Sequence, residues 1–225
     1  MPIDPPVGAV TQASSASKSV PRVLYRYAGA SEVRLQWIRR LLIASELYFT
    51  SPRTFNDPFD CRGVSIEFAA SPLKARQHWR KEARSAYPDE PLRKQKGTIE
   101  RLIAEARTSE GRERLKKSIF DAVAEQGVVC LSKQPANMLM WSHYAEGHKG
   151  IVVRFNMQTM PWTSLLDLIP VQYGTQFPRV NWYEIREKHH PHMLILSTKA
   201  LAWAHEEEWR LVMWVEPGMC AFRFA

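Results

Sequence analysis

Apolar positions in the first fifty residues follow the spacing of one strand, one helix and a second strand. Arg22–Tyr27 reads as a strand, and Leu47–Thr50 is a second short apolar run. Between them, Ser31–Ala44 has the spacing of an amphipathic helix with Ser31 as its N-cap. The side chains expected to face inward are Leu35, Ile38, Leu41 and Leu42.

The middle of the chain has helical spacing. One helix is predicted around Leu73–Ala86, and Pro88 and Pro91 separate it from two later helices. The later helices are marked by Ile99, Leu102, Ile103 and Ala106, and then by Leu115, Ile119, Phe120 and Val123.

The remaining apolar runs predict strands. They are Gly127–Leu131, Gly150–Phe155, Leu165–Tyr173, Met193–Ser197 and Trp209–Val215. Strands in both halves with a helical block between them predict an α+β fold. Residues 1–20 are rich in Pro, Ser and Ala and are expected to be a disordered tail. A single domain then spans 21–225, with residues 71–125 as its helical insertion.

Composition limits the class of protein. With 225 residues, 45% of them hydrophobic, the chain suits one domain with a substantial core. Cys61, Cys130 and Cys220 are far apart, which argues against a disulfide framework and against a cysteine zinc site. No apolar run approaches the roughly 18 residues of a transmembrane helix, and the N-terminus lacks the pattern of a signal peptide. A cytoplasmic protein with no membrane partner is therefore expected, and the oligomeric state stays open.

The formal net charge of +8 is concentrated in one polar segment. Residues 71–122 contain 14 Lys and Arg against 8 Asp and Glu, a surplus of six positive charges. Two interpretations stay open: the solvated face of ordinary helices, or a surface that binds tRNA, rRNA or DNA. In the second case, Lys116 and Lys117 are expected to contact the nucleic acid from an exposed helical face.

Three consecutive carboxylates, Glu206 to Glu208, lead directly into the predicted strand at Trp209. Because side chains alternate along a strand, Glu206, Glu208 and Arg210 are expected to share one face. Close carboxylates repel, and burying either without a partner costs free energy. The stretch is therefore either a solvated strand edge or an acid–base or cation-stabilising site.

Two further segments have an unusual residue content. Asn56 and Asp57, followed by a proline, can fix a turn by bonding local backbone, with Phe55 and Phe59 pinning it to the core. The segment Met138–Gly150 crowds aromatic and proton-transferring groups before a strand. These are Trp141, His143, Tyr144 and His148.

Several familiar site motifs are absent from the sequence. There is no GxSxG, GxxxxGK[ST] or GxGxxG, which argues against ordinary hydrolase, P-loop and Rossmann sites. No HExxH supports a metal site built from His143 or His148 with Glu206 and Glu208, so no metal is expected. The histidines between His189 and His192 have no paired acidic or cysteine ligands and are expected in a surface loop.

In order along the chain, these clusters resemble the bacterial domain-of-unknown-function 2971 family. The resemblance covers about residues 22–215. It depends on five stretches: Leu24–Tyr27, Phe55–Asp60, Cys130–Ser132, Met140–Gly150, and Trp203 with Glu206, Glu208 and Arg210. Family membership of this kind names no reaction.

The layout is also similar to ADP-ribosyltransferases, which implies a split-sheet core with an inserted helical block and NAD as substrate. In that resemblance, Arg26 on the first strand holds the NAD phosphates or ribose, and Ser132 orders the site. Glu208 is the catalytic carboxylate of Glu206-x-Glu208, stabilising an oxocarbenium-like cation. His143 and Tyr144 complete the catalytic set. The residues assigned to NAD binding are Tyr25, Arg26, Tyr27, Ser132, Trp141, Asn56 and Asp57.

The first functional hypothesis is therefore NAD-dependent ADP-ribosyl transfer or NAD cleavage, in a toxin or phage-defence setting. The alternatives are a nucleic-acid-binding module without catalysis and a metal-dependent nuclease using the histidines and glutamates named above. A shared site requires Arg26, His143, Tyr144 and Glu208 to line one cleft.

Overall fold

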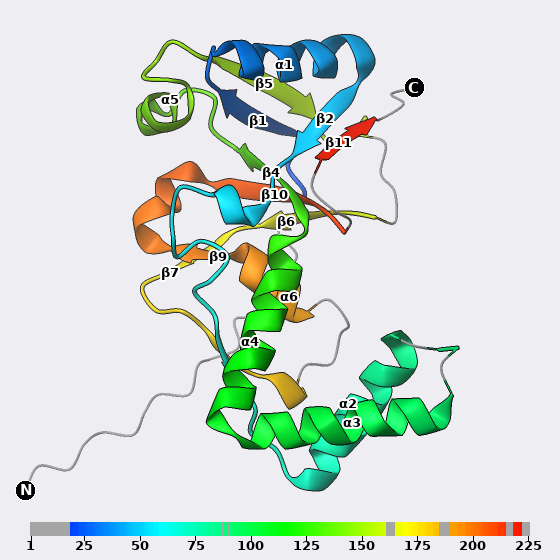
Figure 1. Cartoon of the computed structure of the whole chain (residues 1–225). Coiled ribbons are helices and arrows are strands. Elements are labelled where there is room, and N and C mark those ends of the chain that lie inside the picture. Colours follow the sequence, from blue (N-terminus) through cyan, green and yellow to red (C-terminus); the bar gives the residue numbers. More distant parts are fainter. Residues whose placement is uncertain are drawn as a thin grey trace, which may run out of the picture.

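The structure, a computed structural model, describes residues 19–86, 88–89, 91–160, 165–184, 190–214 and 218–221. It is a mixed α+β fold in which a sheet-containing part carries a projecting lobe of helices (Figure 1). Most of the expected disordered tail at 1–20 lies outside the described residues. None of the described helices is long and apolar enough to cross a membrane.

An antiparallel sheet of five strands forms the centre of the sheet-containing part. Its order is β5 (Ile151–Asn156), β1 (Val23–Ala28), β4 (Gly127–Ser132), β10 (Glu208–Met213) and β6 (Leu166–Pro170). Every residue of β10 is buried, as is typical of a central strand covered on both faces. The strands predicted in these five regions are confirmed, although the strand expected over Leu165–Tyr173 is divided into β6 and β7 (Gln172–Gly174).

The sheet opens between β1 and β4. Their pairing is limited to Tyr25 opposite Ser132, whereas β1 pairs with β5 along its whole length. Beyond this point β4 turns to β2 (Glu46–Phe49), and a bridge joins Thr50 to Val128. On its other edge β2 pairs with β11 (Gly218–Ala221). The divergence of β1 and β4 leaves room for a cavity between the two parts of the sheet.

Helix α1 (Glu32–Ala44) lies against β2, but the predicted inward face is partly wrong. Leu35 is 45% exposed and Leu42 is 72% exposed, whereas Leu41 packs against the core. The rotation of the helix is set by Trp37, whose ring stacks on Tyr48 of β2 with centroids 4.4 Å apart. A large aromatic ring buries more area than a leucine, so its contact determines which face turns inward.

The predicted helical insertion forms a lobe of three helices, α2 (Pro72–Ala86), α3 (Leu92–Arg107) and α4 (Ser109–Ala124). Its core combines small and large apolar side chains, among them Trp79, Ile103 and Leu115, and is closed by Tyr183. Between α3 and α4, the Thr108 hydroxyl accepts a hydrogen bond from the Gly111 amide. A side chain at Gly111 would lie about 2.0 Å from the Glu105 carbonyl oxygen, so the tight turn requires glycine.

The strand predicted at Met193–Ser197 is wrong, because these residues form α6 (His190–Ser197). A short apolar run fits either a helix or a strand, and periodicity alone does not separate them. The surface loop expected around His190 and His192 is likewise the first turn of α6, where Pro191 is tolerated. The expected position of His189 lies outside the described residues.

The remaining elements are short and were not predicted as separate units. They are η1 (Pro52–Thr54), β3 (Ser65–Glu67), α5 (Met138–Tyr144), β8 (Arg179–Asn181), η2 (Trp182–Glu184), β9 (Thr198–Ala200) and η3 (Leu201–Glu206). β3 pairs in parallel with β8, and β7 pairs in parallel with β9. The second pairing brings Lys199 and the start of β10 to the same side of the sheet.

His78 makes the helical lobe sensitive to pH. Its Nε2 atom is buried without a hydrogen-bond partner, among the rings of Trp79, Trp182 and Tyr183. Burial, with a smaller effect of Lys81, lowers the pKa of His78 to about 4. The unfolded chain binds the proton at an ordinary pKa near 6.5 and the folded chain does not, so stability present above that pH is lost as pH falls toward 4.

We therefore expect the free energy of unfolding to drop by roughly 2 kcal/mol more between pH 7 and pH 4.5 in the wild type than in His78→Phe. Urea denaturation followed by circular dichroism at several pH values measures this difference. Parallel pH profiles for the two proteins would contradict the assignment.

Candidate functional site

A cavity of about 540 Å³ lies in the opening between β1 and β4. We call it the central cavity. Its lining comes from segments far apart in sequence: β1, α1, β2, the loop after η1, β4, α5, and the chain from β9 to β10. Polar and aromatic side chains dominate this lining, a composition typical of small-molecule sites.

Arg210 forms the base beneath this cavity and is completely buried. Its Nε donates to Glu208 Oε1 at 2.8 Å, and its Nη2 donates to both carboxylate oxygens of Asp60 at 2.8 Å. Its Nη1 donates to the Leu196 carbonyl at 2.8 Å and contacts the Cys61 Sγ at 3.0 Å. A buried guanidinium needs partners of this kind, since its desolvation would otherwise be prohibitive.

Lys199 is the second buried cation of the site and is 4% exposed. Its Nζ lies 2.5 Å from Glu206 Oε2, 3.0 Å from Glu208 Oε2 and 3.4 Å from Asp60 Oδ2. Trp203 covers this ammonium group, with the ring centroid 5.2 Å from Nζ. The cluster therefore combines two cations with three carboxylates, which gives a formal net charge of −1 when all five groups are ionised.

The backbone around the two glutamates is held by hydroxyl groups. Ser132 Oγ donates to the Glu206 carbonyl at 2.6 Å, and the Glu208 amide donates to the Tyr173 hydroxyl at 2.8 Å. Glu207, between them, has a φ of 44°, which turns its side chain outward while Glu206 and Glu208 stay inside.

Tyr144 connects α5 to this cluster, because its hydroxyl donates to Glu206 Oε1 at 2.6 Å. The position of α5 is fixed by Asn137, whose Oδ1 accepts from the amides of Leu139 and Met140. The Asn137 Nδ2 donates to the His205 carbonyl at 2.7 Å. One residue thus caps the helix and ties it to the segment that carries Glu206.

The two glutamates have pKa values shifted in opposite directions. Burial raises the pKa of Glu206, and the charge of Glu208 adds to this against the opposing effect of Lys199. Burial also acts to raise the pKa of Glu208, but the charges of Arg210 and Lys199 outweigh it and hold that pKa well below its ordinary range. Paired carboxyl groups with diverging pKa values are characteristic of acid–base sites.

The opposite wall of the central cavity is cationic. Arg26 and Arg34 both line it, and neither has an ion-pair partner among the residues described. Arg26 Nη1 makes a long bond of 3.3 Å to the Tyr48 carbonyl, and burial lowers its pKa to about 10, with Arg34 adding to this and Cys130 opposing it. The guanidinium of Arg34 lies 5.2 Å from the Trp37 centroid. The cavity is therefore positive on one wall and negative on its floor.

Nine of the residues predicted to form the site line the central cavity. They are Tyr25, Arg26, Tyr27, Asn56, Ser132, His143, Tyr144, Glu206 and Glu208. The alternative of a solvated strand edge is wrong, because Glu206 is 2% exposed and Glu208 is 4% exposed. The geometry brings these residues together, and their individual roles stay predictions.

Two predicted residues lie outside the cavity lining. Trp141 packs edge-on against Tyr27, with centroids 5.6 Å apart, and its Nε1 donates to the Pro135 carbonyl. Asp57 is buried and accepts a hydrogen bond from the Phe59 amide at 2.9 Å, so it serves the turn itself. Both residues support the walls of the site.

The sequence prediction missed several members of the site. Asp60 ends the stretch Phe55–Asp60 that the sequence singled out, and Lys199 lies a few residues before Trp203, but nothing in their spacing revealed an ion pair between them. Arg34, Trp37 and Tyr48 line the cavity from the first predicted helix and the second predicted strand, in which no site residue was expected. Their lining side chains are recognisable only when α1 is placed against β2.

Cys130 was also missed. Its thiol is accessible within the central cavity, directly across the ladder from Arg210. Burial of the surrounding site, with the charge of Glu208, raises the pKa of this thiol well above its ordinary value. The group is therefore a neutral thiol, not a preformed thiolate nucleophile.

The predicted metal-dependent nuclease set is not assembled. His143 lines the cavity, but His148 is exposed in a turn with a φ of 69°. Glu206 forms an ion pair with Lys199, and Glu208 forms one with Arg210. No group of three His, Cys, Asp or Glu residues in the described parts of the chain could hold a metal ion.

Comparison with known proteins supports one of the two resemblances. Residues 140–211 match the model of a family described as "Protein of unknown function (DUF2971)". This range includes most of α5 and both glutamates of the site. No curated protein and no solved structure matches the chain, and the resemblance to ADP-ribosyltransferases finds no support in these comparisons.

The buried cluster predicts a large difference between two arginine substitutions. Arg210→Met leaves Glu208 and Asp60 without their main partner and should lower the free energy of unfolding by about 3–5 kcal/mol. Arg40→Met removes only the exposed pair with Glu46 and should cost less than about 1 kcal/mol. Urea titrations of both variants measure the two values, and a small loss in both would show that the cluster contributes little to folding.

Proposed function

We propose that the protein cleaves the bond between nicotinamide and ribose in NAD and transfers the ADP-ribosyl group to an acceptor or to water. The observation that carries this proposal is the pair of buried glutamates that line the floor of the central cavity, where Glu208 is held by both buried cations and Glu206 by Lys199 alone. An ADP-ribosyltransferase-like core, with the site in the opening between β1 and β4, is part of the same proposal.

The charge distribution of the cavity suits a substrate with two unlike ends. The nicotinamide ring of NAD carries a positive charge, which fits the cluster of net charge −1 formed by Glu206, Glu208 and their neighbours. The pyrophosphate is negative, and it fits the wall with Arg26 and Arg34. Tyr25 and Tyr27 supply aromatic surface for a planar ring between these ends.

The two glutamates would act at different points of the reaction. As the bond from ribose C1′ to nicotinamide nitrogen breaks, its electron pair leaves with nicotinamide and neutralises that ring. Positive charge develops on the ribose, and the ionised Glu208 stabilises it. Glu206, the more basic carboxylate, takes the proton of the acceptor or water whose lone pair forms the new bond to C1′.

Turnover of NAD should depend strongly on Glu208. Glu208→Gln keeps the size of the side chain and removes its charge, so we expect a roughly 100- to 1,000-fold loss in kcat. Because Glu208 also bonds to Arg210, the thermal midpoint of the variant is measured beside its activity. Tyr144→Phe leaves all the ion pairs in place and should lower kcat by roughly 10-fold through its bond to Glu206.

The matched control is Tyr183→Phe, which removes a buried hydroxyl in the helical lobe instead. Its NAD turnover should equal that of the wild type. NAD consumption and ADP-ribose labelling of protein and nucleic-acid acceptors are the two assays. Wild-type protein that neither binds NAD nor consumes it with any acceptor would contradict the proposal.

Binding of the phosphate end should depend on Arg26. Arg26→Gln removes a charged donor and should weaken ADP-ribose binding by roughly 10- to 100-fold. Arg22→Gln, on the exposed strand end where Arg22 bonds to Gln158, is the control and should bind normally. Calorimetric titration with ADP-ribose measures both affinities without turnover. Equal affinities of the two variants for ADP-ribose would show that Arg26 does not bind the phosphates.

A further inference from the structure

Basic residues of α2 and α3 gather on one flank of the helical lobe. On α2 they are four residues apart, at Arg76, Arg80 and Arg84, and residues at this spacing lie on one side of a helix. On α3 the matching side carries Arg93, Lys96, Glu100 and Arg107. We call these seven residues the basic flank.

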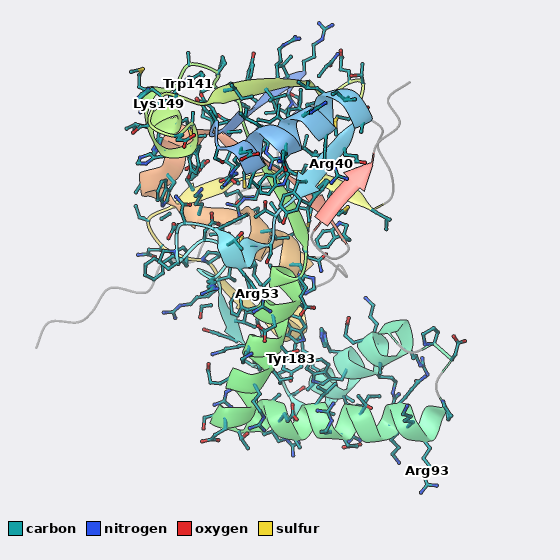
Figure 2. All side chains as sticks on the ribbon, turned by 45° about the horizontal axis from the view of Figure 1, so that its top comes forward. Arg40, Arg53, Arg93, Trp141, Lys149 and Tyr183 are labelled. Carbon is teal, nitrogen blue, oxygen red and sulfur yellow. The ribbon has the colours of Figure 1, made fainter. Side chains whose placement is uncertain are left out.

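The two helices bring these sides together. Arg76 of α2 pairs with Glu100 of α3 at 3.1 Å, which shows that the two rows adjoin. One turn nearer the connection between the helices lie Arg80 and Lys96, both exposed. Beyond them, Arg93 extends away from the end of the lobe (Figure 2). The flank thus contains six basic residues and one carboxylate.

Unpaired cations are more frequent on this flank than in the rest of the lobe. Four cations elsewhere in the lobe form ion pairs, Lys74 with Glu184, Arg101 with Glu105, Lys116 with Glu113 and Lys117 with Asp121, and Arg112 donates to backbone carbonyls. In the part of the chain that the structure describes, Arg80, Arg84, Arg93, Lys96 and Arg107 have no ion-pair partner. Like charges gathered without counter-charges repel one another, and a bound polyanion would relieve that repulsion.

We propose that the basic flank binds the phosphodiester backbone of a nucleic acid. Five of its six cations are arginines, whose planar donor groups match phosphate oxygens. The run from Arg76 to Arg84 rises about 12 Å along the helix, which spans roughly three or four phosphates of one strand. The flank is therefore long enough for several simultaneous phosphate contacts.

A membrane surface fits these helices less well. Membrane-bound amphipathic helices present an apolar face beside the basic one. Here the apolar faces of α2 and α3 are buried in the lobe core, and among their described side chains Leu73 alone is a large exposed apolar group. Contacts with the flank are consequently electrostatic, without an apolar anchor.

Fluorescence anisotropy with a labelled single-stranded RNA of about 20 nucleotides, and with duplex DNA of the same length, tests the proposal across a salt series. The full chain should bind with an affinity that falls as salt rises. Arg80→Glu combined with Lys96→Glu should weaken binding at least about 10-fold and flatten the logarithmic salt slope by about 2.

The control is Lys116→Glu combined with Lys117→Glu, which changes the net charge equally. The sequence suggested these two lysines as the contacts, but the structure pairs them with Glu113 and Asp121, so we now expect the contacts on the basic flank instead. It should change affinity less than about 3-fold, and circular dichroism verifies that both variants fold. Equal weakening by the two double variants, or the absence of salt-dependent binding in the wild type, would overturn the proposal. Polyglutamate that competes as well as RNA would instead assign the flank to an acidic protein and overturn it too.

Discussion

The buried guanidinium of Arg210 holds together the segments that form the floor of the site. It connects β10 to Asp60, which follows η1, and to the Leu196 carbonyl near the end of α6. Removing any of these partners would leave part of a charge desolvated, so the three segments have one low-energy arrangement. The charge of Arg210 also keeps Glu208 ionised, because it is the largest of the effects that oppose burial and lower the pKa of Glu208.

Once Arg210 is satisfied by Glu208 and Asp60, Glu206 is the carboxylate left with weaker compensation. Lys199 touches it but is shared with two other carboxylates, and Tyr144 supplies a neutral hydroxyl. This unequal sharing is why two chemically identical side chains, two residues apart, have diverging pKa values. The excess negative charge of the cluster therefore lies on the side where Glu206 and Tyr144 line the central cavity.

Much of this arrangement was predictable from local pattern. Strand alternation placed Glu208 and Arg210 on one face, and it did so correctly because β10 is regular. Prediction from local pattern failed where tertiary packing decides the secondary structure or the buried face of a helix. The helical run at 193–197 was assigned to a strand because a short apolar run has no periodic signal that separates the two, and Leu35 is exposed because Trp37 sets the rotation of α1. Lys199 was missed because its partners come from separate segments.

The net positive charge of the chain and its candidate chemistry lie in different places. The helical lobe carries the surplus of cations, whereas the buried cluster of the site is negative, so a polyanion on the lobe is not drawn into the cavity floor.

Helix α4 runs from the lobe to the sheet and leads almost directly into β4 (Figure 1). Arg53 and Ser51 tie this end of α4 to η1 through Asp121 and the Ala124 carbonyl. The lobe and the cavity wall at Val128 and Cys130 are therefore joined through a continuous, hydrogen-bonded segment, which fixes where a partner on one would lie relative to the other.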